Sequence, residues 1–264
     1  MTRIGEAFRK LDRPAFIAYL VAGDPAPAGF LAAAQGVVDG GADILELGMP
    51  FSDPVADGPT IQAAHTRALD MGMSVDRYFD FIRDVRRSSE IPLVLMVYCN
   101  TVYRRGVERF YREARDAGAD GVLIVDMPPD EGGRALRAAR ENDLDQIFLV
   151  APSTSDERLG LIAGSGSGFL YLASLLGVTG ARERLSDEAS RLINRVRPRT
   201  RLPLAVGFGI SRPEHAAALR TAGADGVIVG SALVKIVEER AGDTERMARE
   251  IRQFIAGMRK ALER

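Results

Sequence analysis

The sequence contains few of the residues that disulfides and metal sites require. Its single cysteine, Cys99, excludes an internal disulfide framework and any metal site made only of thiolates, and it suits a reducing cytosol. The only two histidines, His65 and His215, lie in segments with helical periodicity, beyond the strand ends that the sequence predicts. A site with several histidine ligands is therefore not available, and we expect no metal.

Lysine is also scarce. Lys10, Lys235 and Lys260 are the only three lysines, and none of them ends a predicted strand. A Schiff-base aldolase, which needs a lysine beside the reacting carbon, is therefore disfavoured. We expect the chemistry of this chain to rest on carboxylates, hydroxyl groups and backbone dipoles.

Long hydrophobic runs and a strong net charge are absent as well. No apolar run approaches the ~18 residues of a membrane span, and the first residues, MTRIGEAFRKL, lack the continuous apolar core of a signal peptide. They instead place Ile4, Phe8 and Leu11 on one face of a short docking helix. The net charge of −1 argues against nucleic acid and membrane surfaces as partners. We expect a cytoplasmic protein.

What the sequence does contain is a repeated alternation of apolar strands and amphipathic helices. The 264 residues are 46% hydrophobic and 27% charged, as in one large α/β domain. Continuous apolar runs separated by helical segments predict a parallel sheet covered by helices. Three helix-to-strand joints are nearly the same: GGADILELG, AGADGVLIVD and AGADGVIVGS. The predicted strands span residues 15–21, 42–48, 92–99, 120–126, 146–151, 168–174, 202–208 and 225–230.

Eight such units in a chain of this length favour a closed (β/α)8 TIM barrel, a single domain over residues 1–264, over an open dinucleotide-binding sheet. No GxGxxG motif follows the first strand, which disfavours the open sheet further. The N-terminal helix is an addition to the barrel, and residues 242–264 predict a final amphipathic helix. Residues 49–91 form the longest gap between strands. The barrel therefore carries an enlarged loop after its second strand, and such loops are usually functional.

In this fold the chemistry is built at the carboxyl ends of the strands. Glycine-rich segments follow the last three strands: GVTG (177–180), GFG (207–209) and GSA (230–232). Glycines let backbone N–H groups approach a phosphate, and a helix N-terminus adds a favourable dipole. Either these glycines only turn the chain or, as their shared position favours, they bind a phosphate ester. The other candidates at the strand ends are Asp24, Glu46, Asp57, Tyr98, Asn100, Asp126, Tyr171, Thr179, Phe208 and Ser231.

Two carboxylates occupy unusual positions in the segment DILELGMPFSDPVADGPT. By strand alternation Ile44, Glu46 and Gly48 share one face, so Glu46 projects toward the barrel mouth if that face points inward. A carboxylate buried there has the raised pKa that a proton shuttle needs; the alternative is a buried ion pair. Asp57 either belongs only to an Asp-Gly turn, with Asp57 or Pro59 starting the next helix, or serves the site. Asp126 is either a ligand to the site or, as we favour, a loop anchor.

The segment ELGMPFSDPVADGPTIQ closely resembles the signature of the tryptophan synthase alpha chain family. The resemblance runs in order along nearly the whole chain, at the strand ends already selected. It continues through AYLVAGDP (18–25), VYCN (97–100), IVDMPPDE (124–131), LVAPSTSDERL (149–159), YLASLLGVTGAR (171–182), GFGIS (207–211) and VGSALVK (229–235).

This resemblance implies a lyase that cleaves indole-3-glycerol phosphate to indole and glyceraldehyde 3-phosphate by a retro-aldol step in tryptophan biosynthesis. It implies that Glu46 performs the acid–base work and that Asp57 accepts the indole N–H. Thr179 belongs to a loop that closes over the substrate and hydrogen-bonds Asp57 in the family. Tyr171 would assist in the pocket. The implied walls for the indole are Tyr19, Met96, Tyr98 and Phe208, and the implied phosphate ligands are Gly180, Gly209, Gly230 and Ser231.

The resemblance also implies a partner. In the family this rim docks onto a beta chain in an α2β2 heterotetramer, and pyridoxal phosphate belongs to that beta chain, so we expect no cofactor on this chain. The residues expected at the interface are Pro50, Asp53, Pro54 and Asn100. Three rival functions are a lyase that works alone, an activating subunit with vestigial catalysis, and another phosphate-binding barrel enzyme of aromatic amino-acid biosynthesis. The last usually needs a lysine or cysteine at the strand ends, where this chain has only Cys99.

Overall fold

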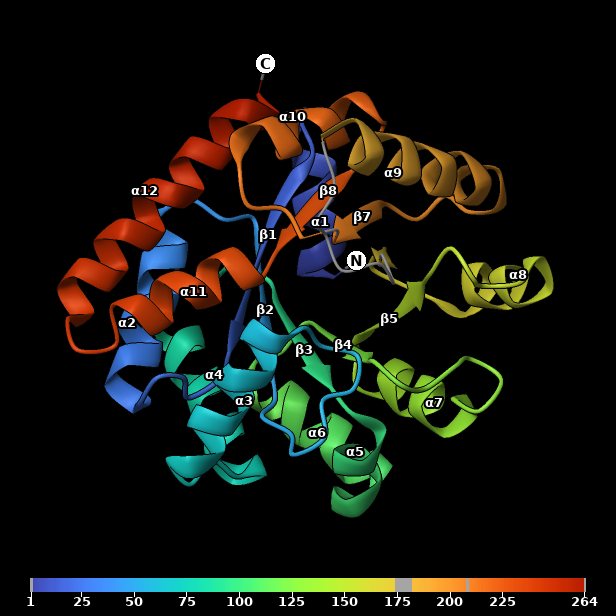
Figure 1. The fold of residues 1–264 in the computed structure, drawn as a ribbon. Coiled ribbons are helices and arrows are strands. Elements are labelled where there is room, and N and C mark those ends of the chain that lie inside the picture. Colours follow the sequence, from blue (N-terminus) through green and yellow to red (C-terminus); the bar gives the residue numbers. More distant parts are fainter. Residues whose placement is uncertain (1, 174–181, 208, 264) are drawn as a thin grey trace.

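A computed structural model describes residues 2–173, 182–207 and 209–263, with the side chains of residues 182–186 left aside. Its eight strands are all parallel and close into one barrel in sequence order, with helices around the outside (Figure 1). The predicted (β/α)8 TIM barrel is therefore confirmed. The strands are β1 (Ala15–Val21), β2 (Ile44–Gly48), β3 (Leu93–Val97), β4 (Gly121–Ile124), β5 (Asp145–Val150), β6 (Leu170–Ala173), β7 (Leu204–Gly207) and β8 (Gly226–Val229).

The helices follow the predicted alternation, and three connections, those after β2, β3 and β6, contain a second helical element. The long connection after β2 contains the loop 49–58 and two helices, whereas a simple crossover has one helix. The helices are α1 (Arg3–Lys10), α2 (Pro27–Asp39), α3 (Pro59–Asp70), α4 (Val75–Ser88), α5 (Cys99–Arg105), α6 (Val107–Ala117), α7 (Gly133–Glu141), α8 (Asp156–Ser165), α9 (Arg182–Val196), the 3-10 turn η1 (Arg197–Arg199), α10 (Pro213–Thr221), α11 (Ser231–Glu239) and α12 (Thr244–Leu262).

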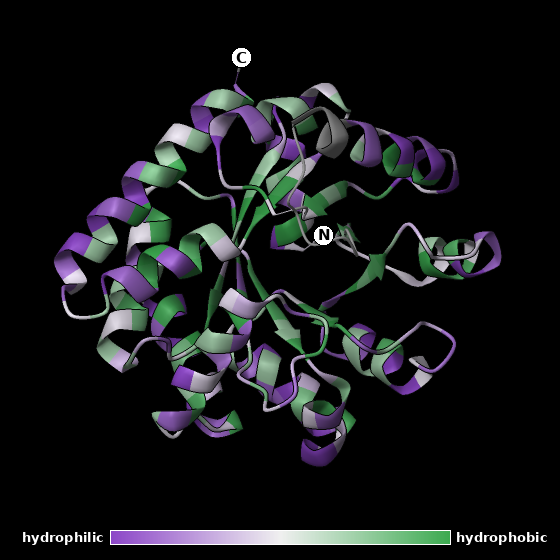
Figure 2. Ribbon diagram, in the orientation of Figure 1, coloured by the Kyte–Doolittle hydropathy of each residue, from purple (hydrophilic) through white to green (hydrophobic). Residues whose placement is uncertain are grey.

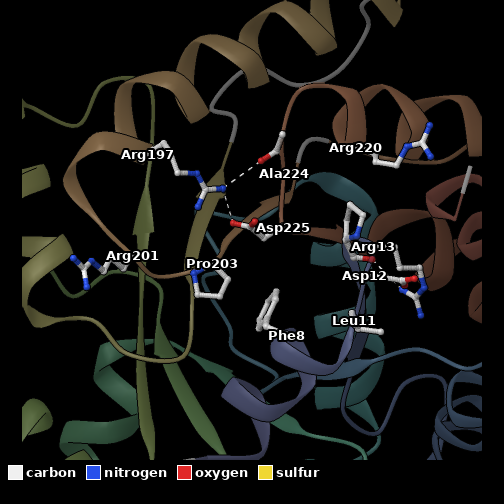
Figure 3. A pocket seen from close by; sticks show the side chains of 12 residues that line it. Phe8, Leu11, Asp12, Arg13, Arg197, Arg201, Pro203, Arg220, Ala224 and Asp225 are labelled. Atoms are coloured by element: carbon white, nitrogen blue, oxygen red, sulfur yellow. Dashed lines mark hydrogen bonds and ion pairs between the residues drawn. The ribbon is translucent and has the colours of Figure 1, made fainter.

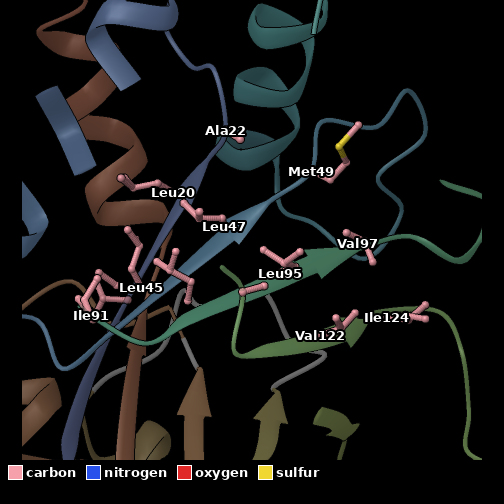
Figure 4. Packing of buried hydrophobic residues seen from close by; sticks show 14 of the residues in the cluster. Leu20, Ala22, Leu45, Leu47, Met49, Ile91, Leu95, Val97, Val122 and Ile124 are labelled. Atoms are coloured by element: carbon pink, nitrogen blue, oxygen red, sulfur yellow. The ribbon is translucent and has the colours of Figure 1, made fainter. Parts of the chain in front are cut away.

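Strand alternation divides the apolar residues between two cores. On β2, Leu45 and Leu47 face outward into the layer between strands and helices, where Figure 4 shows them beside Leu20 and Leu95. Ile44 faces inward and packs with the residues that fill the barrel. In Figure 2 the strands are mostly hydrophobic and the hydrophilic residues gather on the helices, as this arrangement requires. The shared inward face predicted for Ile44 and Glu46 is therefore correct.

Helix α1 closes the amino end of the barrel. Ile4 is fully buried among the interior residues, and the Phe8 ring lies 5.7 Å from that of Phe169, between ring centroids. Thr2 caps the helix by accepting a hydrogen bond from the Gly5 N–H, 3.2 Å away. The predicted docking helix is confirmed for Ile4 and Phe8. Leu11 lies one residue past the last helical residue, where it serves as the C-cap and is half-buried.

The final helix packs against α2 along two glycines. A Cβ atom on Gly36 would lie 2.7 Å from the Ala248 carbonyl oxygen, and one on Gly40 would lie 2.9 Å from the Ile255 Cβ. The two helices therefore approach more closely than larger side chains would permit. Across the described ranges, none of the helices is both long and apolar enough to span a membrane.

Replacing Ile4 by alanine tests whether α1 is part of the core. We expect Ile4→Ala to lower the free energy of unfolding by about 2–5 kcal/mol, because it leaves a cavity at the floor of the barrel. Chemical denaturation would measure the loss. The control is Leu161→Ala, since the Leu161 side chain on α8 is 49% exposed and should change stability little. Equal stability of both variants would show that α1 is an optional addition.

Candidate active site

Glu46 lies buried inside the barrel. It sits on β2 between Tyr19 of β1 and Val94 of β3, and it is 0% exposed. Neither carboxylate oxygen has a hydrogen-bond partner among the described residues. Burial, with a smaller contribution from the charge of Asp57, raises the pKa of Glu46 to about 8. Within the described residues no cation pairs with it, so the geometry favours the proton shuttle over the buried ion pair.

Two tyrosines surround Glu46 because glycines at the strand ends leave room for them. A Cβ atom on Gly48 would lie 2.2 Å from the Tyr19 Oη, and one on Gly207 would lie 2.6 Å from the Tyr171 Oη. Burial and then the charges of Asp57 and Glu46 raise the pKa of Tyr19 well above its ordinary value, and burial and the same two carboxylates do so for Tyr171. Both phenols are therefore neutral hydrogen-bond donors at the mouth.

Asp57 is held near Glu46 by the end of β3. Its Oδ2 accepts a hydrogen bond of 2.7 Å from the Tyr98 hydroxyl, and its side chain is only 6% exposed. The Phe51 ring stacks on Tyr98 at 4.7 Å between centroids, and the Ala56 N–H donates to the Tyr98 Oη. The loop 49–58 is thus tied to the barrel rim through Tyr98.

Asp57 does not begin the following helix. The N-cap of α3 is Gly58, and α3 starts at Pro59 with no side-chain cap. The alternative in which Asp57 only starts the helix is therefore wrong. The carboxylate is left available for the site.

The other candidates at the strand ends divide into mouth residues and anchors. Met96 of β3 packs with both interior clusters, beside Tyr19. Asp126 accepts the Cys99 N–H at 2.7 Å, which confirms the favoured loop anchor. Cys99 is half-buried, and burial raises the pKa of its thiol to about 11. Asp24 is buried and bound by Arg67 through two hydrogen bonds of 2.8 and 3.1 Å, so it is a structural ion pair.

The predicted phosphate ligands lie where a strand gives way to a helix or turn. Gly230 is the N-cap of α11, Ser231 is the first residue of that helix, and Gly209 has a φ of 63°. Because Gly230 has no side chain, the N-cap residue itself does not occupy the first backbone N–H groups of α11, which are the kind of donors that bind a phosphate. Three predicted residues, Thr179, Gly180 and Phe208, lie outside the described residues.

The residues of the predicted partner surface differ in exposure. Pro50, two residues after the end of β2, is buried in the isolated chain, and its place at an interface stays a prediction. Asp53 and Asn100 are exposed and Pro54 is half-buried. Val55, which the sequence analysis did not select, is 84% exposed. An apolar side chain this exposed on the same loop extends the surface that a partner could cover.

Sequence reasoning also missed His65, which it considered only as a metal ligand. The structure buries His65 on α3 with its Nε2 3.4 Å from the Asp57 Oδ2. A polar residue on the face of α3 that carries the buried Ala64 and Ala68 was the available signal. In the part of the chain that is described, no three His, Cys, Asp or Glu residues cluster as a metal site would require. That no metal binds stays a prediction.

A cavity of about 470 Å³ lies at the opposite end of the barrel (Figure 3). Its walls include Phe8 and Leu11 of the α1 region and several arginines. Arg13 is bound by Asp43 through two hydrogen bonds of 2.8 and 2.9 Å, and Arg197 is bound by Asp225. Because neither catalytic candidate lines this cavity, it belongs to the structural end of the barrel.

Comparison with known proteins agrees with this geometry. The family model of the tryptophan synthase alpha chain matches residues 6–263. The chain belongs to this family. A tryptophan synthase alpha chain of Methanoregula boonei is 51% identical over 263 residues, covering 100% of this chain and 99% of that relative. Another, of Methanothermobacter thermautotrophicus, is 51% identical over 256 residues, covering 97% and 94%.

Solved structures of the family are similarly close. The tryptophan synthase alpha subunit of Legionella pneumophila matches with a TM-score of 0.91 and 36% identity, covering 100% of this chain and 99% of that chain. A chain in the α2β2 tryptophan synthase complex of Pyrococcus furiosus matches with a TM-score of 0.87 and 43% identity, covering 93% and 98%. The resemblance seen in the sequence motifs is therefore confirmed at the level of family and fold.

The raised pKa of Glu46 predicts how stability depends on pH. Between the ordinary value of 4.5 and about 8, the folded chain keeps a proton that the unfolded chain has lost. The wild type should therefore lose stability across this range, by up to about 1.4 kcal/mol per pH unit. Glutamine does not titrate. The free energy of unfolding of Glu46→Gln should therefore rise relative to that of the wild type from pH 5 to 8, and the difference should stay constant above pH 8.

Denaturation of both proteins at several pH values would measure this difference. The matched control is Glu214→Gln, the same substitution at an exposed residue, which should show no such trend. If the difference in the free energy of unfolding between Glu46→Gln and the wild type stayed constant from pH 5 to 9, Glu46 would not be neutral in the folded chain.

Proposed function

We propose that this chain cleaves indole-3-glycerol phosphate to indole and glyceraldehyde 3-phosphate, as the alpha subunit of a tryptophan synthase. The observation that carries the proposal is the pair of carboxylates at the barrel mouth. Glu46 is buried, has no hydrogen-bond partner among the described residues and has a pKa of about 8, and Tyr98 donates a hydrogen bond to the nearby Asp57. Family membership supports the same reaction.

Glu46 has the protonation state that the first step needs. At neutral pH a group with a pKa of about 8 is mostly protonated and can donate its proton to C3 of the indole. The carboxylate so formed then takes the proton of the side-chain hydroxyl next to C3. The bond between C3 and that carbon breaks, its electrons return to the indole ring, and the hydroxyl carbon becomes the aldehyde. Glu46 ends the cycle protonated.

Asp57 stabilises the charge that this step creates. Protonation at C3 makes the indole nitrogen cationic, and a carboxylate that accepts the N–H lowers the energy of that state. The two contacts that the described residues make to the Asp57 carboxylate, from Tyr98 and His65, both involve Oδ2. Oδ1 is thereby left for the substrate.

The phosphate would bind at the N-terminus of α11. Backbone N–H groups of Gly230 and Ser231, together with the turn at Gly209, offer donors and a favourable helix dipole at the mouth. Family membership implies Gly180 as a further phosphate ligand, Phe208 as a wall for the indole, and Thr179 as part of a loop that closes over the substrate and hydrogen-bonds Asp57. The substrate class is therefore a small phosphate ester with an aromatic group directed at Glu46.

An assay for indole release by the purified chain tests the activity. Glu46→Gln keeps the shape and hydrogen-bonding capacity of the side chain but removes the proton, so turnover should fall by about 10²–10⁴-fold with substrate affinity largely kept. The control is again Glu214→Gln, which should match the wild type. Near-normal turnover of Glu46→Gln would remove Glu46 from the mechanism.

We also propose that the loop 49–58 binds a tryptophan synthase beta chain. The relative from Pyrococcus furiosus is part of an α2β2 complex, and the exposed Asp53 and Val55 lie on the loop that also carries Asp57. Docking would order the loop and bring Asp57 to the indole nitrogen. Pyridoxal phosphate would remain with the beta chain.

Asp53→Ala separates partner binding from catalysis. It leaves both proposed active-site carboxylates in place, so the slow activity of the isolated chain should stay nearly intact while activation by a beta chain weakens. Indole release with and without the beta chain measures both. Asp116→Ala, at an exposed position on α6, is the control and should keep full activation. Loss of isolated activity in Asp53→Ala, or unchanged activation, would refute this division.

A further inference from the structure

The buried His65 is a titratable group that the proposed mechanism does not use. It lies on α3, directly after the loop 49–58, and is only 2% exposed. Its Nδ1 accepts a hydrogen bond of 3.0 Å from the Phe51 N–H. An acceptor nitrogen carries no proton, so the proton of the neutral ring must sit on Nε2.

The protonated nitrogen of His65 faces Asp57. The distance from Nε2 to the Asp57 Oδ2 is 3.4 Å, and Nε2 has no hydrogen-bond partner among the described residues. The same oxygen accepts the Tyr98 hydroxyl at 2.7 Å. The Tyr98 hydroxyl and the His65 Nε2, from different elements, thus converge on one oxygen of Asp57.

Helix α3 is a fixed support for this contact. Arg67, two residues after His65, binds Asp24 after β1 and also Glu238 of α11, at 2.8 Å in each case. Ala64 and Ala68 pack in one cluster with Tyr19. The position of His65 is therefore set by the barrel and not by the loop that it contacts.

We propose that His65 is a positioning residue for Asp57. Its Nε2–H orients the carboxylate through Oδ2 so that Oδ1 meets the indole N–H, while Nδ1 anchors the loop through Phe51. At 3.4 Å the Nε2 contact is longer than a formed hydrogen bond, and it shortens when the substrate draws the loop onto α3. The inference rests on the proposed function, because Asp57 needs orientation only if it serves the indole nitrogen.

Two substitutions separate the two nitrogens of His65. In His65→Asn the amide oxygen takes the place of Nδ1, so the Phe51 N–H keeps an acceptor but Asp57 loses its donor. In His65→Gln the amide nitrogen reaches the place of Nε2, so Asp57 keeps its donor but Phe51 loses its acceptor. A purely structural role through the loop anchor would make glutamine the worse replacement.

We expect His65→Asn to lower kcat for indole release about tenfold and His65→Gln to stay within about threefold of the wild type, because the lost donor serves a charged group. The Tm of each variant, measured alongside, would locate a temperature at which all are folded. In an Asp57→Asn background the two variants should no longer differ. The proposal would be overturned if His65→Gln lowered kcat more than His65→Asn. It would also be overturned if the two variants still differed in kcat to the same extent in the Asp57→Asn background.

Two measurements do not depend on turnover. The affinity for an indole alkyl phosphate that lacks the side-chain hydroxyls should fall in His65→Asn and hold in His65→Gln. The ¹⁵N NMR spectrum of the wild type should show the His65 proton on Nε2, with His215→Gln assigning the only other histidine. A proton on Nδ1 would refute the proposal whatever the activity. A correct tautomer in a chain that releases no indole would instead refute the proposed function.

Discussion

Burial of one carboxyl group, that of Glu46, is the constraint on which the carboxyl end of the barrel depends. A carboxylate removed from water without a partner costs several kcal/mol, and the protein avoids that cost by keeping the group protonated. Protonation requires that no cation come near, and among the described residues the neighbours are tyrosines, Met96 and the carboxylate of Asp57. The apolar and anionic surroundings therefore follow from the need for a neutral acid.

The second carboxylate has the opposite requirement. In the proposed reaction Asp57 accepts the indole N–H, so its carboxylate must be held in place rather than isolated. The Tyr98 hydroxyl, one residue after β3, donates to its Oδ2, and the Nε2 of His65 on α3 lies 3.4 Å from the same oxygen. The two carboxylates of the pocket thus differ in their surroundings: among the described residues Asp57 accepts a hydrogen bond from a side chain, and Glu46 accepts none.

Strand alternation made the barrel and Glu46 predictable from the sequence. The alternation of side chains along β2 is enough to predict that Glu46 faces inward with Ile44. The apolar strands and the repeated glycine-containing connections from helix to strand are enough to predict the fold. The contact between His65 and Asp57 was not predictable, since it depends on how far the loop folds back onto α3. The ion pair of Asp24 with Arg67 was not predictable either, because it joins residues 43 positions apart.

The two ends of the barrel divide stability from chemistry. At the amino end charged groups are paired: Arg3 and Arg86 bind Asp120, and Arg13 binds Asp43. Helix α1 seals that end with Ile4. At the carboxyl end Glu46 and the Nε2 of His65 remain without hydrogen-bond partners in the described chain. Among the described residues the Arg259 Nε on α12 is also buried without a hydrogen-bond partner, so one unpaired polar group does not by itself mark a site. At the carboxyl end, however, the unpaired groups are two that both interact with Asp57, whose charge raises the pKa of Glu46 and whose Oδ2 lies 3.4 Å from the His65 Nε2, and a substrate bound between them would complete the arrangement.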